Sequence, residues 1–135
     1  MAKPFYRDPR RELRPVPFAK PLILCIEDDD IYLQLRKAVL EKQGYNVIGA
    51  TTIEDAITVL REAPVCCIIA DHVLRGKTGQ GAAKQMKRIK PDVPLVLFSG
   101  TLPEKLDDID VYVNKGEPTA VLLKIVRDLT ERFSS

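Results

Sequence analysis

The sequence predicts a doubly wound α/β domain, in which helices cover both faces of a parallel β-sheet. Five short apolar runs of strand length alternate along the chain with segments whose apolar residues recur at helical spacing. The runs are apolar at successive positions rather than at every second one, as expected for strands that are buried on both faces. The length agrees, because 135 residues make one domain, or one domain with a tail.

Each element of the fold has a signal of its own. The strands are predicted at 22–26, 46–50, 65–70, 93–98 and 111–113. The helix after the first strand is expected to start at a cap formed by Asp29 or Asp30 and to reach Lys42, Thr52 caps the next helix, and Pro118 opens the last. Helical spacing of apolar residues marks three helix faces: Ile53, Ala56, Ile57 and Leu60, then Ala83, Met86 and Ile89, and finally Leu122, Ile125, Val126 and Leu129.

The composition excludes several other classes of protein. With 45% apolar and 30% charged residues, the chain is globular rather than disordered throughout. Its longest apolar run, Val65–Ala70, is far shorter than the roughly 20 residues that span a bilayer, and the N-terminus lacks a secretory signal. We therefore expect a cytoplasmic protein without a membrane partner. Three cysteines are too few for a disulfide framework or a four-ligand zinc site, so we expect them to pack in the core.

Residues 1–20 differ from the rest of the chain in charge and in pattern. They contain four prolines, six Lys or Arg and two Asp or Glu, with neither helical nor strand periodicity. The net charge of +2 therefore comes from this segment. We expect a flexible basic tail over 1–20 and a folded domain over 21–135. Such a tail can contact nucleic acid, but tails of this kind are more often simply solvated, so nucleic acid is not an expected partner unless the tail binds it.

Polar side chains gather where the predicted strands end. The first strand is followed by Glu27–Asp30, the third by Asp71, the fourth by Ser99 and the fifth by Lys115. In open α/β sheets, ligands bind in the crevice at the carboxyl ends of the strands. We therefore expect these side chains to share one site.

If the first and third strands are neighbours, Glu27, Asp28 and Asp71 form a cluster of carboxylates. Mutual repulsion in such a cluster raises a pKa or requires a cation, and a hard divalent ion with oxygen ligands, above all Mg²⁺, meets that need. Ser99 supplies a hydroxyl on the other side and Lys115 a positive charge. Carboxylate, Mg²⁺, hydroxyl and lysine together suit phosphoryl transfer to a carboxylate nucleophile, because that chemistry depends mostly on positioning and charge neutralisation.

These residues resemble the receiver domain of two-component response regulators, whose fold is that of the chemotaxis regulators. The resemblance runs from Pro21 to about Phe133 and rests on four elements in order. They are an acidic pair after the first strand, an acceptor aspartate with a glycine eight residues later, a hydroxyl residue before a small one, and an aromatic three positions before a lysine. In this chain they are ILCIEDD with Glu27 and Asp28, IIADHVLRGKTG with Asp71 and Gly79, Ser99 with Gly100, and Tyr112 with Lys115.

The resemblance implies a five-stranded flavodoxin-like sheet of order 2-1-3-4-5 and a phosphoacceptor at Asp71. The phosphoryl group would come from a histidine kinase or a phosphotransfer protein. Mg²⁺ would be held by Asp28, by Asp71, by Glu27 through water, and by the backbone carbonyl of Val73.

The resemblance also implies a switch. Ser99 and Lys115 would bind the phosphoryl oxygens, and a shift of the Ser99 hydroxyl would let Tyr112 turn inward and reshape the surface that meets a partner protein. Tyr112 can also be explained as a half-buried aromatic that only packs.

The chain departs from the family pattern in three places. Arg75 stands where a proline is usual, and Gly116 replaces the proline that normally follows the lysine through a cis peptide, which leaves the Lys115–Gly116 bond open between cis and trans. Between Ser99 and Lys115 the chain is several residues shorter than is usual in the family. We expect a shortened or irregular fourth helix and a non-standard way of meeting partners.

The function expected from the sequence is that of a stand-alone receiver. It would be a signalling switch without its own output domain, and not an enzyme beyond its own phosphorylation and dephosphorylation; its downstream target stays open. The alternative is a phosphorylation-independent interaction module that keeps the fold without the switch. An aspartate-nucleophile phosphatase would need a second acid two residues after Asp71, where the chain has Val73. The lone histidine, His72, is expected to have a structural or surface role.

Overall fold

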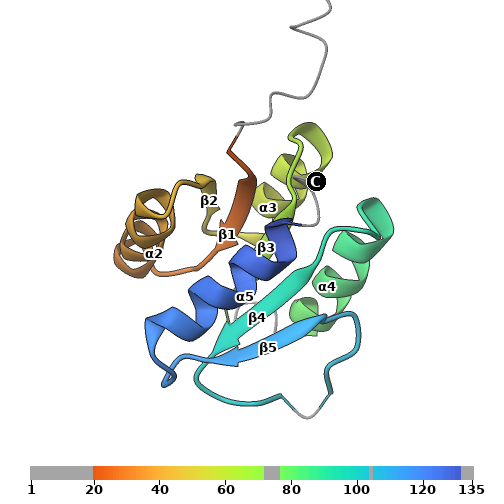
Figure 1. The fold of residues 1–135 in the computed structure, drawn as a ribbon. Coiled ribbons are helices and arrows are strands. Elements are labelled where there is room, and N and C mark those ends of the chain that lie inside the picture. The colour runs from red at the N-terminus through yellow and green to blue at the C-terminus, as the bar shows by residue number, and fades with distance from the viewer. Residues whose placement is uncertain (1–19, 72–76, 104, 132–135) are drawn as a thin grey trace, which may run out of the picture.

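The computed structural model describes residues 20–71, 77–103 and 105–131, in which strands and helices alternate (Figure 1). The strands are β1 (Leu22–Ile26), β2 (Asn46–Ala50), β3 (Cys67–Ala70), β4 (Leu95–Ser99) and β5 (Val111–Asn114). The helices are α2 (Asp30–Lys42), α3 (Ile53–Glu62), α4 (Lys77–Ile89) and α5 (Thr119–Glu131). β1 and β2 agree with the predicted strands at both ends, whereas β3 and β4 both begin two residues later than predicted.

The described strands form one parallel sheet in the order β2-β1-β3-β4-β5, as predicted. The last residue of β1, Ile26, pairs with Ala50 of β2 on one side and with Ala70 of β3 on the other. In the same way Ser99 of β4 pairs with Asn114 of β5. The residues that follow β1, β3, β4 and β5 are therefore brought to one edge of the sheet.

Helices α2 and α5 cover one face of the sheet, and α3 and α4 cover the other (Figure 1). Successive residues of β1 face opposite layers: Ile23 and Cys25 pack in the core beneath α2 and α5, and Leu24 and Ile26 in the core beneath α3 and α4. Burial on both sides explains why apolar residues occupy successive positions in these strands.

Side-chain caps start two of the helices. The carboxylate of Asp29 accepts hydrogen bonds from the backbone N–H groups of Ile31 at 2.9 Å and Tyr32 at 3.2 Å, which begins α2 directly after the acidic residues that follow β1. Thr52 caps α3 through the N–H of Asp55 at 3.1 Å. Both caps agree with the sequence prediction, since short polar side chains satisfy the unpaired N–H groups of a first helical turn.

The connection from β4 to β5 contains no helix in its described residues, 100–103 and 105–110. This confirms that the helix expected between these two strands, the fourth in the sequence prediction, is shortened or irregular. Side-chain contacts anchor the connection instead. The carboxylate of Asp110 accepts a hydrogen bond from the backbone N–H of Leu95 at 2.7 Å and forms an ion pair with Lys87 of α4. The shortened connection is thus tied to both β4 and α4.

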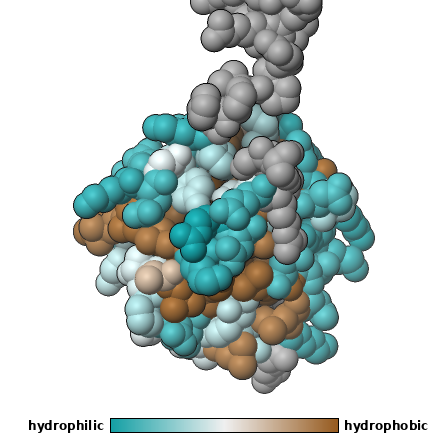
Figure 2. Space-filling model, in the orientation of Figure 1, coloured by the Kyte–Doolittle hydropathy of each residue, from teal (hydrophilic) through white to brown (hydrophobic). Residues whose placement is uncertain are grey.

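The outer surface of α2 is unusually apolar (Figure 2). Its exposed side chains include Ile31, Tyr32, Leu35 and Val39. Brown surface over α2, at the left of Figure 2, corresponds to this region. Across the described chain, no helix is both long enough and apolar enough to pass through a bilayer.

The buried thiols give a first prediction. All three cysteines are free and buried, and burial raises the pKa of Cys25 to about 11 and also raises the pKa of Cys66 and Cys67. Because the thiolate is the reactive form, we expect the native protein at about pH 8 to react with a disulfide reagent only as fast as it unfolds, and the denatured protein to react at once. Absorbance of the released thiol measures this. Prompt reaction of one native cysteine would contradict the burial described here.

Candidate functional site

Three carboxylates meet at the carboxyl edge of the sheet. Glu27 and Asp28 follow β1, and Asp71 follows β3, which is the neighbour of β1. One carboxylate oxygen from each residue lies within 4.8 Å of the other two. Glu27 and Asp71 are each 1% exposed, whereas Asp28 is exposed and marks the side on which the cluster meets solvent. These three residues are called the carboxylate cluster below.

Lys115 reaches the carboxylate cluster from the end of β5. Its Nζ lies 3.5 Å from Oε2 of Glu27 and 3.5 Å from Oδ2 of Asp71. No cis peptide bond occurs in the described part of the chain, so the Lys115–Gly116 bond is trans. The turn is held differently, because Oδ1 of Asn114 accepts a hydrogen bond from the N–H of Gly116 at 2.7 Å. Asn114 therefore holds the turn in which Gly116 replaces the usual proline.

Ser99 and Tyr112, the predicted switch residues, contact each other. The Ser99 hydroxyl is buried and donates to the carbonyl of Thr101 at 3.2 Å, while the N–H of Thr101 lies 3.3 Å from the same hydroxyl. The hydroxyl of Tyr112 donates to the carbonyl oxygen of Ser99 at 3.2 Å and accepts from Nδ2 of Asn114 at 3.0 Å. Tyr112 is half-buried and packs against the core beneath α3 and α4.

Sequence reasoning missed Arg36 and Phe98. Nη1 of Arg36 lies 2.8 Å from Oε2 of Glu27, and the guanidinium lies over the Phe98 ring, 4.7 Å from its centroid. Lys115 approaches the same ring, with Nζ at 5.9 Å. A signal was present in the sequence, because Arg36 lies at helical spacing from the two buried leucines of α2, Leu33 and Leu40.

The surroundings of Glu27 favour its charged form. Burial acts most strongly and raises the pKa of Glu27, but hydrogen bonds with Asp71 and Arg36 and with the backbone of Asp29, together with the charge of Lys115, outweigh it. The pKa of Glu27 is thereby lowered to about 2. A carboxylate that accepts several hydrogen bonds next to a cation stays ionised in this way.

The carboxylate cluster fits a hard divalent cation. It offers three carboxylates at close range, and oxygen ligands of this kind are those that Mg²⁺ prefers. Val73, which was expected to add a backbone carbonyl, lies outside the described residues. The expectations for His72 and Arg75 also fall outside them, as does the tail up to residue 19.

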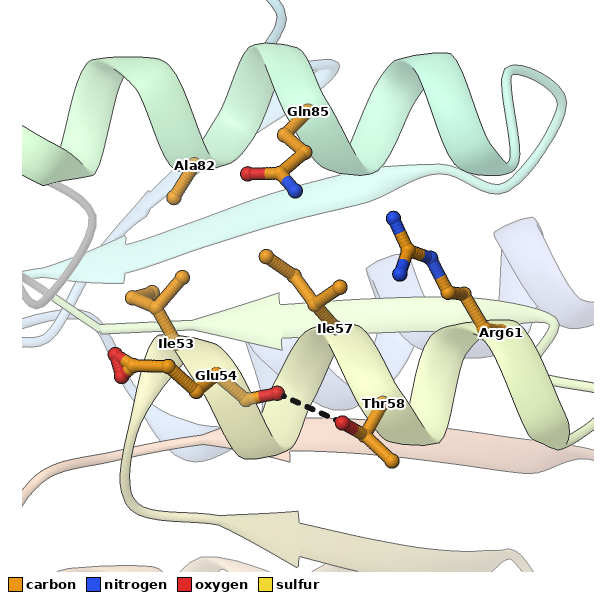
Figure 3. A pocket seen from close by; sticks show the side chains of 7 residues that line it. All are labelled: Ile53, Glu54, Ile57, Thr58, Arg61, Ala82 and Gln85. Atoms are coloured by element: carbon orange, nitrogen blue, oxygen red, sulfur yellow. Dashed lines mark hydrogen bonds between the residues drawn. The ribbon is translucent and has the colours of Figure 1, made fainter.

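A groove of about 610 Å³ lies apart from the carboxylate cluster, between α3 and α4 (Figure 3). Its lining is Ile53, Glu54, Ile57, Thr58, Arg61, Ala82 and Gln85, with the Thr58 hydroxyl donating to the Glu54 carbonyl at 3.1 Å. None of the predicted site residues lines it. The candidate site is therefore a charged edge of the sheet and not this groove.

Comparison with known proteins shows which family the chain resembles. The sequence model of the response regulator receiver domain matches residues 23–126. The transcriptional regulatory protein AfsQ1 of Streptomyces coelicolor is 34% identical over 93 residues, which are 69% of this chain and 39% of that protein. AruR of Pseudomonas aeruginosa, also a transcriptional regulatory protein, is 31% identical over 98 residues, or 69% of this chain and 38% of AruR. The chain thus spans less than half the length of these relatives.

Solved structures share the fold. A two-component response regulator from Clostridium difficile superposes with a TM-score of 0.76 at 22% identity, covering 86% of this chain and 100% of that chain. The response regulator TrrA of Thermotoga maritima, in complex with Mg(2+)-BeF, has a TM-score of 0.72 at 24% identity and covers 81% of this chain and 98% of that chain. Both matches support the flavodoxin-like sheet order predicted from the sequence.

The lowered pKa of Glu27 gives a prediction about acid stability. Because the folded-state pKa is about 2, below the ordinary 4.5, ionised Glu27 stabilises the fold above that ordinary value and loses this effect as the pH falls toward 2. The variant Glu27→Gln resembles the protonated acid. We expect it to be less stable than the wild type by on the order of 2 kcal/mol at about pH 6, with the difference narrowing toward about pH 2.5. Urea unfolding across this range measures the difference, and a gap that stays constant would contradict the assignment.

Proposed function

Because this chain belongs to the response regulator receiver domain family, we propose that Asp71 accepts a phosphoryl group and that the domain then signals to a partner protein by changing shape. The proposed donor is a histidine kinase or a histidine-containing phosphotransfer protein. The family match establishes the receiver domain, and the acceptor, the donor class and the residues around the reaction are proposed.

The observation that carries this proposal is the position of Lys115. Its Nζ lies at the same distance, 3.5 Å, from Asp71 and from Glu27, so one cation serves both the proposed acceptor and its acidic neighbour. A phosphoryl group on Asp71 brings additional negative charge to this point. A cation already aimed at the acceptor stabilises that charge without moving far, which is how electrostatic catalysis of group transfer works.

In the proposed reaction, a carboxylate oxygen of Asp71 attacks the phosphorus of a phosphohistidine. The phosphorus–nitrogen bond breaks, the imidazole leaves and takes up a proton from water, and a mixed carboxylic–phosphoric anhydride forms on Asp71. Lys115 holds one phosphoryl oxygen. Mg²⁺ bound by Asp28 and Asp71, by Glu27 through water and by the Val73 carbonyl would neutralise charge on the phosphoryl group in the transition state.

The proposed switch starts from the contacts of Ser99. To bind a phosphoryl oxygen, its hydroxyl has to exchange its hydrogen bond to Thr101 for one to the new group. The carbonyl of the same residue accepts the hydrogen bond of Tyr112, so movement at Ser99 is transmitted directly to the aromatic side chain. Tyr112 lies on the edge strand β5, next to the shortened connection where a partner is expected to bind.

A second candidate is an interaction module that does not depend on phosphorylation. The observation in its favour is the missing helix in the described part of the β4–β5 connection. The switch of a receiver needs a surface that can rearrange, and here Asp110 ties the connection to Leu95 and Lys87. The two functions differ in a single measurable property, which is whether Asp71 takes up phosphate.

Phosphorylation with a small donor tests the proposal. Incubation with acetyl phosphate and Mg²⁺ is expected to add the mass of one phosphoryl group to the wild type, and Asp71→Asn is expected to abolish the addition because an amide is a far weaker nucleophile. Intact mass spectrometry measures it. Asp92→Asn, the same change at an exposed aspartate, is the matched control and is expected to behave as the wild type.

Two outcomes would contradict the proposal. A folded wild-type protein that takes up no phosphate supports the interaction module instead. Phosphate that persists on Asp71→Asn places the acceptor elsewhere in the chain.

A further inference from the structure

Arg36 is a nearly buried cation that no step of the proposed reaction uses. Its side chain is 11% exposed, although arginine rarely leaves water unless it is paired. It lies three residues after Leu33 and four before Leu40, so it belongs to the face of α2 that packs on the sheet. Meanwhile Leu35 on the same helix is exposed. The helix therefore buries charged Arg36 while apolar Leu35 stays exposed. The contacts of Arg36 must offset the cost of burying its charge.

Contacts with Glu27 and Phe98 hold the guanidinium in place. It donates a hydrogen bond to Oε2 of Glu27 at 2.8 Å, and it lies over the face of Phe98 at 4.7 Å from the ring centroid. A planar guanidinium can bind a carboxylate and stack on an aromatic ring at the same time, which the compact ammonium of lysine does less well. The position therefore suits arginine better than lysine, and Arg36 binds Glu27, one of the three residues of the carboxylate cluster.

The contact changes the charge that a metal ion would meet. A bound metal ion requires its carboxylate ligands to be ionised. With all three ionised, Lys115 alone would leave two negative charges in excess, and Arg36 reduces the excess to one. Arg36 also engages Oε2 of Glu27, the same oxygen that lies near Lys115. A cation held this close to the cluster weakens the attraction for a divalent ion by ordinary Coulomb repulsion.

We propose that Arg36 is a built-in counterion that sets the metal affinity of the site. It holds the Glu27 side chain in place in the metal-free protein, and it makes Mg²⁺ bind more weakly than the three carboxylates would allow by themselves. Arg36 is a positioning residue and touches none of the reacting atoms. This inference rests on the proposed function, because it takes the carboxylate cluster as the Mg²⁺ site.

Titration calorimetry with Mg²⁺ tests the inference. We expect Arg36→Met, which keeps the length of the side chain without its charge, to bind Mg²⁺ at least about fivefold more tightly than the wild type. Arg36→Lys keeps the charge and is expected to stay near wild-type affinity. The matched control is Lys37→Met, which removes the same charge one residue along α2 and is expected to change the affinity by less than about twofold.

Arg36→Gln replaces Arg36→Met if circular dichroism shows that the methionine variant is unfolded, since glutamine can still donate to Glu27. Equal or weaker Mg²⁺ binding by the folded neutral variant would overturn the inference, and so would an equal gain in Lys37→Met. Adding Asp28→Asn is expected to remove the tighter binding, and tight binding that survives would place the ion outside the cluster and also overturn it.

Failure of the proposed function gives a different result from failure of this inference. If acetyl phosphate leaves no phosphate on Asp71 in either the wild type or the Arg36 variants, the proposed function fails, whatever the Mg²⁺ affinities are. If Asp71 is phosphorylated but the affinities do not change, only the role of Arg36 is wrong.

Discussion

The structure depends on keeping two buried carboxylates next to an exposed one at the end of a parallel sheet. Glu27 and Asp71 are almost fully removed from water, and burying a charge is costly unless it is paired and hydrogen-bonded. Lys115, which follows β5, and Arg36 of α2 both supply the compensating positive charge. The pairing of β1 with β3 brings the carboxylates together, because it places the residues after Ile26 and after Ala70 side by side.

The same edge links chemistry to the surface. Lys115 is aimed by the end of β5, where Asn114 closes the turn onto Gly116 and also donates to Tyr112. Tyr112 in turn bonds to the backbone of Ser99, at the end of β4. One side chain, that of Asn114, therefore touches both the lysine turn and the aromatic residue of the proposed switch. The family proline is absent here, and the turn is shaped instead by a local hydrogen bond that the Gly116 N–H donates to Oδ1 of Asn114.

The pattern of strands and helices predicted a parallel sheet whose carboxyl ends bring polar side chains to one edge, and the resemblance to receiver domains predicted the strand order. Together they predicted the convergence of Glu27, Asp28, Asp71 and Lys115. They predicted β3 and β4 less well, since apolar residues before each strand, such as Val65 and Val93, are buried without being in the sheet.

The helical spacing of Arg36 from Leu33 and Leu40 was a weak signal, and it was missed for a physical reason. A charged residue among apolar ones in a helix is normally assigned to solvent, and α2 carries apolar residues on its exposed side as well as its buried side, which hides the true inner face. Only the packing of α2 on the sheet places Arg36 between Glu27 and Phe98. The shortening before β5 could be counted from the chain, whereas the anchoring of Asp110 required its position beside Leu95.

We propose that the carboxylate cluster accommodates a phosphoryl group on Asp71 with the help of Mg²⁺ and Lys115. Fluorine NMR of beryllofluoride, which mimics a phosphoryl group on a carboxylate, tests it most directly. We expect bound fluoride resonances that require both Mg²⁺ and the wild-type Asp71, and that weaken strongly in Lys115→Ala. If the folded wild-type protein shows no bound resonance in the presence of Mg²⁺, or if the resonance is unchanged in Asp71→Asn, Asp71 is not the acceptor in this cluster.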